Sequence, residues 1–290
     1  MRVLVTGAGG QLGQALVRTA PGAITLRALA RAALDIADAG AVSAALSELR
    51  CELVINAAAF TRVDAAESQP QEAQRVNAIG PALLAAACRT RGAWLAQVST
   101  DYVFDGAQTE PYVPSSIPNP LNVYGSSKLA GERAVIHELG DRCTVVRTSW
   151  VYGAGHRNFL TTMLDRFARP EAVRVVSDQI GVPTHVAGLA RVLWALCERR
   201  AAGLWHWSDS GVASWYDFAV AIAEESAALR AGAAAPPLLP IRSAEYPTAA
   251  RRPRFSVLDK HATEDLLGMR APHWRVALRE VLAETREHRA

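Results

Sequence analysis

A tyrosine and a lysine four residues apart are the first candidates for chemistry in this chain. The sequence contains two lysines, Lys128 and Lys260, and Lys128 follows Tyr124 by four residues. On a helix, this spacing places both side chains on one face, one turn apart. We expect the lysine ammonium to favour tyrosinate and to lower the pKa of the Tyr124 phenol from about 10 toward neutrality. Such a phenol can donate a proton to an alkoxide that forms on a substrate carbonyl. A surface Tyr–Lys pair is the competing interpretation.

A hydroxyl group upstream supports the catalytic interpretation. Residues Trp94 to Val98 are predicted to form a strand, which ends on Ser99, Thr100 and Asp101. Hydroxyls at the carboxyl end of a parallel strand face the binding crevice of an open α/β sheet. Thr100 could therefore hydrogen-bond the same substrate oxygen that Tyr124 protonates.

A glycine-rich turn at the start of the chain predicts a phosphate-binding site. Arg2 to Val5 reads as a short strand, and the apolar pattern from Gln11 to about Thr19 is helical. Gly7, Gly10 and Gly13 lie between and just inside these elements, so the free N–H groups at the helix N-terminus can bind a pyrophosphate. An ordinary tight turn is the alternative, but the position between strand and helix favours a dinucleotide.

The residues after the second predicted strand, Ala23 to Leu26, bear on the choice of cofactor. An acidic residue about 20 positions beyond the glycines usually binds the adenosine ribose hydroxyls of NAD. Here the chain has Arg27 and Arg31, with Ala30 where a carboxylate is common. An arginine attracts a 2′-phosphate, so the sequence favours NADPH and leaves NADH as a possibility. Plain surface charge is the alternative role for these arginines.

Strands and helices alternate through the rest of the first half. The prediction is an α/β fold: a Rossmann-like, doubly wound parallel sheet with a smaller, mixed α/β C-terminal substrate domain. Residues 1–155, with 185–208 returning to them, form the dinucleotide domain, and residues 156–184 and 209–290 form the substrate domain.

The sequence also predicts the main elements. In the first half these are a helix over Ala39–Leu49 capped by Asp38, a strand over Leu53–Asn56, helices over Asn77–Arg91 and from Tyr124 to about Leu139, and a strand over Cys143–Arg147. In the second half they are a strand over Val173–Val176, an irregular connection over Asp178–Thr184, a helix over Val186–Arg199, a helix over Trp215–Leu229 capped by Ser214, and a loop over Ala231–Pro237.

Composition excludes several classes of protein. The formal net charge is +3 without a long basic run, which argues against nucleic acid as a partner. No window of about 18 apolar residues could span a membrane, and the first residues do not form a signal-peptide core. The four cysteines are scattered without a C-x-x-C pair, which predicts buried thiols in the cytoplasm. The histidines show no metal-binding spacing, so no metal site is assigned.

Five further sequence motifs indicate a particular protein family. Together with the glycine turn and the Tyr-x-x-x-Lys pair, they resemble the dTDP-4-dehydrorhamnose reductases of the extended short-chain dehydrogenase/reductase superfamily. The strings are VINAAAFTRVDAAE at residues 54–67, STDYVFDG at 99–106, LNVYG at 121–125, RTSWVYG at 147–153 and DQIGVPT at 178–184. The resemblance runs from residue 1 to about 260.

The resemblance implies an activity and a set of site residues. The activity is the NADPH-dependent reduction of a nucleotide-sugar, dTDP-4-dehydro-L-rhamnose, for cell-surface polysaccharide such as lipopolysaccharide. Tyr124 would be the proton donor, Lys128 its partner and Thr100 the hydroxyl that orients the carbonyl. The implied cofactor-binding residues are Gly7, Gly10, Gln11, Leu12, Gly13, Arg31, Asp35, Ile36, Ala57, Ala58, Ala59, Tyr124 and Lys128. The implied substrate-binding residues are Thr100, Asp101, Tyr124 and Trp150.

Three matters stay open at this point. Some family members form homodimers through a magnesium ion, but the glutamates that hold it do not align here, so Mg²⁺ is not assigned and a homodimer is only possible. A nucleotide-sugar epimerase or dehydratase and a non-catalytic, reductase-like regulatory subunit are the rival functions. The segment from Tyr246 to Pro253, with Arg251 and Arg252, is either a substrate-facing lid or a solvated basic turn.

Overall fold

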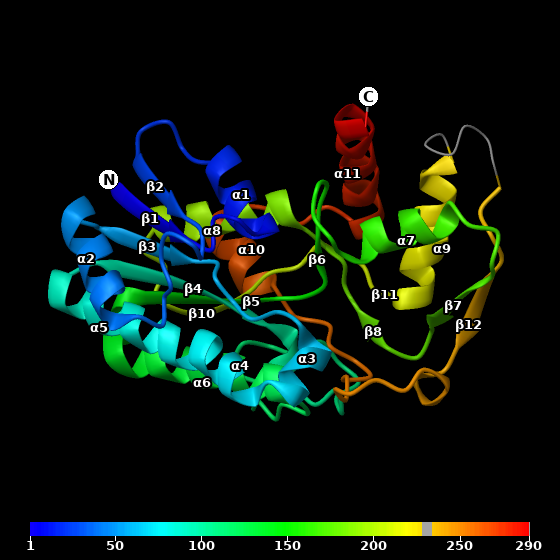
Figure 1. The fold of residues 1–290 in the computed structure, drawn as a ribbon, viewed down its shortest axis with the longest axis horizontal. Helices are drawn as coiled ribbons and strands as arrows, with labels where there is room; N and C mark the ends of the chain where they lie inside the picture. Colours follow the sequence, from blue (N-terminus) through cyan, green and yellow to red (C-terminus); the bar gives the residue numbers. More distant parts are fainter. Residues whose placement is uncertain (228–233, 290) are drawn as a thin grey trace.

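A parallel β-sheet of six strands forms the centre of the molecule. The computed structural model describes residues 1–227 and 234–289, and Figure 1 shows its sheet on one side and a second lobe on the other. The strand order is β10-β5-β4-β3-β1-β2, so the direction of winding reverses between β1 and β3. At such a switch point, ligands bind at the carboxyl ends of the strands. The strands are β1 (Arg2–Thr6), β2 (Thr25–Leu29), β3 (Leu53–Asn56), β4 (Trp94–Thr100), β5 (Cys143–Thr148) and β10 (Gly203–His206).

Helices cover both faces of this sheet, as the predicted doubly wound α/β fold requires. Side chains alternate along β1, so Val3 and Val5 pack against the first helical layer and Leu4 against the second. The first layer holds α1 (Gln11–Arg18), α8 (Val186–Glu198) and α10 (His261–Leu267). The second holds α2 (Ala39–Leu49), α5 (Gly80–Arg91) and α6 (Val123–Leu139). The fold class is therefore confirmed.

The second lobe has its own apolar core, in which Phe218, Leu160 and Leu278 are fully buried. Its helices are α7 (Phe159–Phe167), α9 (Trp215–Glu225) and α11 (Trp274–Arg289). Short strand pairs support them: β7 (Val173–Val176) with β12 (Leu238–Ile241), β8 (Ile180–Gly181) with β11 (Ala213–Ser214), and β6 (Val151–Tyr152) with β9 (Thr184–His185). Within the described residues, no helix is long and apolar enough to cross a membrane.

The connections between these elements carry the remaining short helices. Two of them, α3 (Val63–Ser68) and α4 (Pro70–Gln74), precede α5 and lie beside α6. The 3₁₀ turns are η2 (Asp101–Val103), η3 (Gly140–Arg142) and η5 (Ser243–Glu245).

Three elements differ from the sequence prediction. The second strand spans Thr25–Leu29 instead of Ala23–Leu26, so Arg27 lies within it and not after it. The backbone ladder with β1 sets its register, and its side chains are mostly exposed. The helix expected from Asn77 starts earlier and contains a π-helical turn, Arg75–Ile79, before α5. Pro81 lacks an N–H to donate to the carbonyl of Asn77, which explains the wider turn. The connection expected over residues 178–184 contains β8 and the start of β9.

The cap predicted for α9 is confirmed. The hydroxyl of Ser214 accepts a hydrogen bond from the backbone N–H of Asp217, and the Asp217 carboxylate accepts one from Ser214. The helix ends at Glu225. The predicted end at Leu229 and the first residues of the loop predicted over Ala231–Pro237 lie outside the described residues.

Candidate active site

The glycine turn joins β1 to α1 as the sequence predicted. Gly7 has a φ of 68°, and a Cβ built on it would lie 2.5 Å from the backbone nitrogen of Ala58. A Cβ on Gly13 would lie 2.3 Å from the carbonyl oxygen of Gly7. Gly10 is the N-cap of α1 and donates its N–H to that same carbonyl at 3.0 Å. The backbone can approach this closely only where Gly7 and Gly13 have no side chain.

A cavity of about 390 Å³ opens beside the turn. Its lining includes predicted cofactor-binding residues: Gly7, Gly10, Arg31, Asp35, Ile36, Ala57, Ala58 and Ala59. It also includes residues that the sequence reasoning missed: Gly9, Leu34, Phe60, Thr61, Arg62 and Val76. Phe60, Thr61 and Arg62 lie within the string at residues 54–67, which could have indicated them. Val76 reaches the cavity only because the chain returns through α3 and α4, and no motif marks it.

Five predicted cofactor residues do not line the cavity: Gln11, Leu12, Gly13, Tyr124 and Lys128. Leu12 packs in the core, and Gly13 is buried against Ala8. Gln11 donates its amide to the carbonyl of Val151 at 3.0 Å, which ties α1 to β6.

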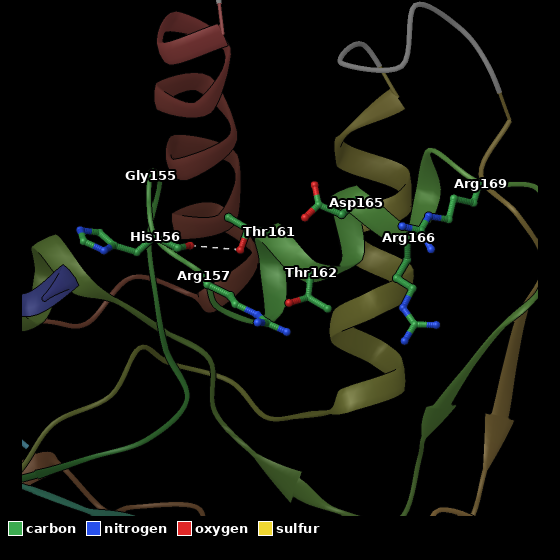
Figure 2. Close-up of a pocket in the computed structure, with 8 residues that line it drawn as sticks. All are labelled: Gly155, His156, Arg157, Thr161, Thr162, Asp165, Arg166 and Arg169. Atoms are coloured by element: carbon green, nitrogen blue, oxygen red, sulfur yellow. Dashed lines mark hydrogen bonds between the residues drawn. The ribbon is translucent and has the colours of Figure 1, made fainter. Parts of the chain in front are cut away.

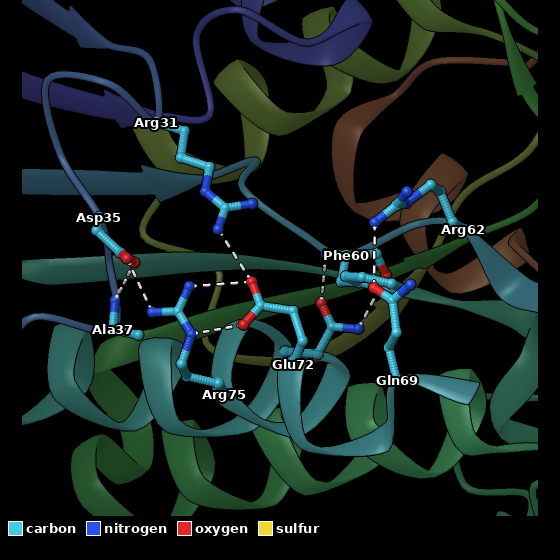
Figure 3. A network of polar contacts seen from close by, with 9 residues as sticks. Arg31, Asp35, Ala37, Phe60, Arg62, Gln69, Glu72 and Arg75 are labelled. Atoms are coloured by element: carbon cyan, nitrogen blue, oxygen red, sulfur yellow. Dashed lines mark hydrogen bonds and ion pairs between the residues drawn. The ribbon is translucent and has the colours of Figure 1, made fainter. Parts of the chain in front are cut away.

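The two arginines considered for the 2′-phosphate differ in position. Arg31 lines the cavity and donates to Glu72 at 3.0 Å, whereas Arg27 pairs with Glu48 at 2.9 Å and is absent from the lining. A Cβ built on Gly9 would lie 3.5 Å from that of Ala30, so Ala30 sits against the turn. Figure 3 shows Arg31 above a network with Glu72, Arg75 and Asp35.

The Tyr124–Lys128 pair occupies the first turns of α6, where Asn122 caps the helix by accepting from Gly125 N at 2.8 Å. Lys128 is buried and donates to the carbonyl of Val98 at 2.6 Å. Tyr124 hydrogen-bonds Thr100 at the end of β4. The structure therefore brings Thr100, Tyr124 and the lysine together where the sequence predicted them.

The hydroxyl of Thr100 is held by its neighbours in the chain. Thr100 Oγ1 donates to Asp101 Oδ1 at 3.0 Å and accepts from the backbone N–H of Tyr102 at 3.2 Å. These contacts hold the hydroxyl at the end of β4, beside Tyr124.

The expected lowering of the Tyr124 pKa is wrong for this structure. Burial raises the pKa of Tyr124 to about 12; the Thr100 hydrogen bond lowers it, and the negative charge of Asp101 raises it. The lysine does not offset this effect, since its ammonium is directed at Val98. Burial also lowers the pKa of Lys128 to about 8, against the opposing charge of Glu132. The phenol is therefore protonated at neutral pH, as a proton donor must be.

Asp101, predicted to contact substrate, lies behind Thr100. Only 2% of its surface is exposed. Burial raises the pKa of Asp101 to about 7, while hydrogen bonds with Ser256 and Thr100 lower it.

A second cavity, of about 480 Å³, lies in the other lobe. Aromatic and apolar side chains line it together with three arginines, of which Arg174 lies on β7. The lining residues are Phe159, Thr162, Met163, Arg166, Ala172, Val173, Arg174, Val175, Val176, Gln179, Trp215, Tyr246, Thr248 and Arg252. Trp150, a predicted substrate residue, is not in this lining. Its ring stacks on Trp215 with centroids 3.5 Å apart and planes 5° apart, and Trp215 forms the wall.

Arg252 connects this cavity to the Tyr124 region. Its guanidinium donates to both carboxylate oxygens of Asp64, at 3.1 and 2.7 Å, and hydrogen-bonds Tyr102. The Tyr102 ring meets that of Tyr124 edge-on, with centroids 5.8 Å apart. Arg252 is thus only partly exposed, whereas Arg251 is exposed, so the segment is not simply a solvated basic turn.

A larger cavity, of about 720 Å³, adjoins the second and shares Thr162 and Arg166 with it. Figure 2 shows Arg157, Arg166 and Arg169 around α7, with the His156 ring directed away from them. None of the three arginines forms an ion pair with a described residue, and Asp165 is the one acidic residue in the lining. This region therefore carries uncompensated positive charge.

Comparison with known proteins gives the family. The family model described as "RmlD substrate binding domain" matches residues 1–287. The chain belongs to this family. It is 42% identical to the spore coat polysaccharide biosynthesis protein SpsK of Bacillus subtilis, over 98% of this chain and 97% of that protein. It is 43% identical to a dTDP-4-dehydrorhamnose reductase of Streptomyces griseus, over 96% and 92%.

Comparison with solved structures supports the same family. A dTDP-4-dehydrorhamnose reductase from Bacillus anthracis in complex with NADP has a TM-score of 0.92 and 36% identity, over 98% of this chain and 99% of that one. A UDP-glucose 4-epimerase of Thermus thermophilus matches with a TM-score of 0.84 but 21% identity, which shows a shared fold alone. The chain is an oxidoreductase, and the predicted family resemblance is confirmed.

Proposed function

We propose that this protein reduces the C4 keto group of dTDP-4-dehydro-L-rhamnose to give dTDP-L-rhamnose, with NADPH as the reductant. The single observation that carries the proposal is the position of Tyr124. Its phenol is protonated, hydrogen-bonded to Thr100, and linked through Tyr102 to Arg252 of the second cavity. The family and its reductase relatives support the same assignment.

The first cavity fits a nicotinamide dinucleotide. The N-terminus of α1 and the Cβ-free surface of Gly7 suit a pyrophosphate, and Arg31 suits the charge of a 2′-phosphate. When bound, NADPH supplies the hydride. The reductase from Bacillus anthracis was solved with NADP, which supports this choice of cofactor.

Three side chains supply the protein's part of the reaction. Tyr124 donates a hydrogen bond to the carbonyl oxygen and then transfers its proton as negative charge develops there. Thr100 hydrogen-bonds the same oxygen once its hydroxyl turns away from Asp101. Lys128 donates to the carbonyl of Val98 one helical turn from Tyr124, and we assign it, with Tyr124, to the cofactor side of the site.

The second cavity suits a nucleotide-sugar. Trp215, backed by Trp150, offers an apolar wall, while Arg252 and Arg166 offer positive charge for a diphosphate. The free arginines of the adjoining cavity would raise the local concentration of such an anion. We assign residues 1–155 and 185–208 to the cofactor. Residues 156–184 and 209–290 are assigned to the nucleotide-sugar, except α10, which packs on the sheet of the dinucleotide domain.

The rival functions account less well for the site. An epimerase or dehydratase keeps NAD bound through its cycle, whereas this chain has Ala30 at the position where a ribose-binding carboxylate is common, and Arg31 lines the cavity. A regulatory subunit without activity has no need of the buried Tyr124 and Lys128.

The surroundings of the reaction complete the proposal. Four free, buried cysteines fit a reducing cytoplasm. Nucleic acid and membrane are not partners in this proposal. A homodimer and a magnesium requirement stay predictions. The molecular mass in solution tests the first, and activity after treatment with a chelator tests the second.

The deciding experiment follows NADPH absorbance with purified protein and dTDP-4-dehydro-L-rhamnose, with the UDP analogue as the matched control. We expect oxidation of NADPH with the dTDP sugar and at least about tenfold lower kcat/KM with the UDP sugar. Absence of turnover with the dTDP sugar, or equal turnover with both, would overturn the assignment.

A further inference from the structure

Arg31, the cavity residue that suits a 2′-phosphate, already has an anionic partner. Its guanidinium Nη2 lies 3.0 Å from Oε1 of Glu72. The same carboxylate accepts from Arg75, with Nε at 2.7 Å and Nη2 at 3.0 Å. Arg75 in turn donates to Asp35 at 2.8 Å. Figure 3 shows these four residues as one chain of alternating charge.

The two arginines are held to different extents. Arg75 has three hydrogen bonds to two carboxylates, and its side chain is 33% exposed. Arg31 has one hydrogen bond, and its side chain is 72% exposed. An arriving phosphate therefore displaces the Arg31 contact more readily than those of Arg75.

The charges of this group cancel. Two guanidinium groups face two carboxylates, so the edge of the cavity has little net positive charge for a phosphate. The Arg75 hydrogen bond holds the pKa of Glu72 below its ordinary value, burial opposes this, and Arg31 adds to it. Glu72 is therefore a carboxylate at neutral pH and attracts the guanidinium of Arg31.

We propose that Glu72 is a specificity-determining residue that weakens the preference for NADPH over NADH by competing with the 2′-phosphate for Arg31. NADH has no 2′-phosphate and leaves the Arg31–Glu72 pair intact. NADPH must take Arg31 from Glu72. This inference rests on the proposed use of NADPH in the first cavity.

The test is direct binding of NADPH and NADH, followed by nucleotide fluorescence without any sugar substrate. In Glu72→Gln we expect NADPH to bind about threefold to tenfold more tightly and NADH to change less than about twofold. In Arg31→Ala the preference for NADPH should fall, and adding Glu72→Gln to Arg31→Ala should then have no effect on the ratio. Glu48→Gln is the matched control, because it frees Arg27 outside the cavity and should change neither affinity.

Two results would overturn the inference: an unchanged NADPH-to-NADH ratio in Glu72→Gln, or a change that persists when Arg31 is alanine. The second would mean that Glu72 acts through the shape of α4 and not through Arg31. If Glu72→Gln does not fold, Arg31→Ala decides alone, since equal affinities for NADPH in that variant and wild type contradict the proposal. Failure of the proposed sugar reduction would not alter these binding ratios, so the two outcomes are distinguishable.

Discussion

At the scale of single residues, the sequence predicted which side chains meet but not their protonation. Tyr124, Lys128 and Thr100 could be found because motif spacing on a helix and at a strand end fixes their neighbourhood. The pKa of Tyr124 could not be predicted from the sequence, because it is raised chiefly by burial, which depends on segments distant in the chain. Glu72 was missed for a related reason, since the partner of Arg31 lies 41 residues away.

Replacing Ala30 by Asp should invert the cofactor preference. The new carboxylate would lie against the glycine turn, repel a 2′-phosphate and accept hydrogen bonds from the ribose hydroxyls of NADH. We expect the ratio of kcat/KM for NADPH to that for NADH to fall by about tenfold or more. A ratio within about twofold of wild type would mean that the ribose lies elsewhere.

The buried carboxyl of Asp101 should make stability depend on pH. Its pKa is raised from 3.8 to about 7, so the folded chain binds the proton more tightly than the unfolded chain. Stability therefore falls as the pH rises from about 4 to about 7. In Asp101→Asn this fall should be smaller, and thermal unfolding between these pH values is the measurement. Burial also raises the pKa of Asp209 to about 7. The part of the stability loss that comes from Asp209 should therefore remain in Asp101→Asn. An unchanged slope in Asp101→Asn would contradict this account.

At the scale of elements, the repeated strand–helix pattern predicted the sheet and most of its helices. Apolar runs identify buried strands such as β3, whereas edge strand β2 has mostly exposed side chains and its start was misplaced. The Trp150–Trp215 stack could not be predicted, because it joins a turn with φ of 45° to the start of a helix in the other lobe.

Gly13→Ala should destabilise the first βα unit. Its Cβ would overlap the carbonyl of Gly7, so the turn and α1 must separate. We expect a loss of about 1–3 kcal/mol in the free energy of unfolding and weaker dinucleotide binding. Gly22→Ala, which meets no atom within 4 Å, is the control and should change neither. Equal stability of the two variants would show that the turn does not depend on this contact.

At the scale of the whole molecule, the ion pair between Arg252 and Asp64 joins the second lobe to α3 of the dinucleotide domain. Asp64 belongs to α3 beside the dinucleotide cavity, and Arg252 lines the cavity of the second lobe. The two residues of the pair are 188 positions apart in the sequence. The sequence alone therefore could not tell which of Arg251 and Arg252 contacts the substrate. The structure distinguishes them, because Arg252 reaches the cavity and Arg251 is exposed.

Arg252→Gln should therefore raise KM for the nucleotide-sugar by about tenfold while leaving NADPH affinity within about twofold. Arg251→Gln is the neighbouring control and should keep KM near the wild-type value, since Arg251 is not among the residues that line the cavity. Steady-state kinetics with varied sugar, together with NADPH titration, separates the two effects. A larger effect of Arg251→Gln would reverse the assignment.

The most direct test of the central claim is Tyr124→Phe, measured as kcat for the dTDP sugar alongside NADPH affinity. The change removes the phenol oxygen that hydrogen-bonds Thr100 and keeps the ring that contacts Tyr102. We predict that kcat falls by about 10² or more with NADPH affinity nearly unchanged, because only the proton donor is lost. Turnover near the wild-type rate in this variant would contradict the mechanism.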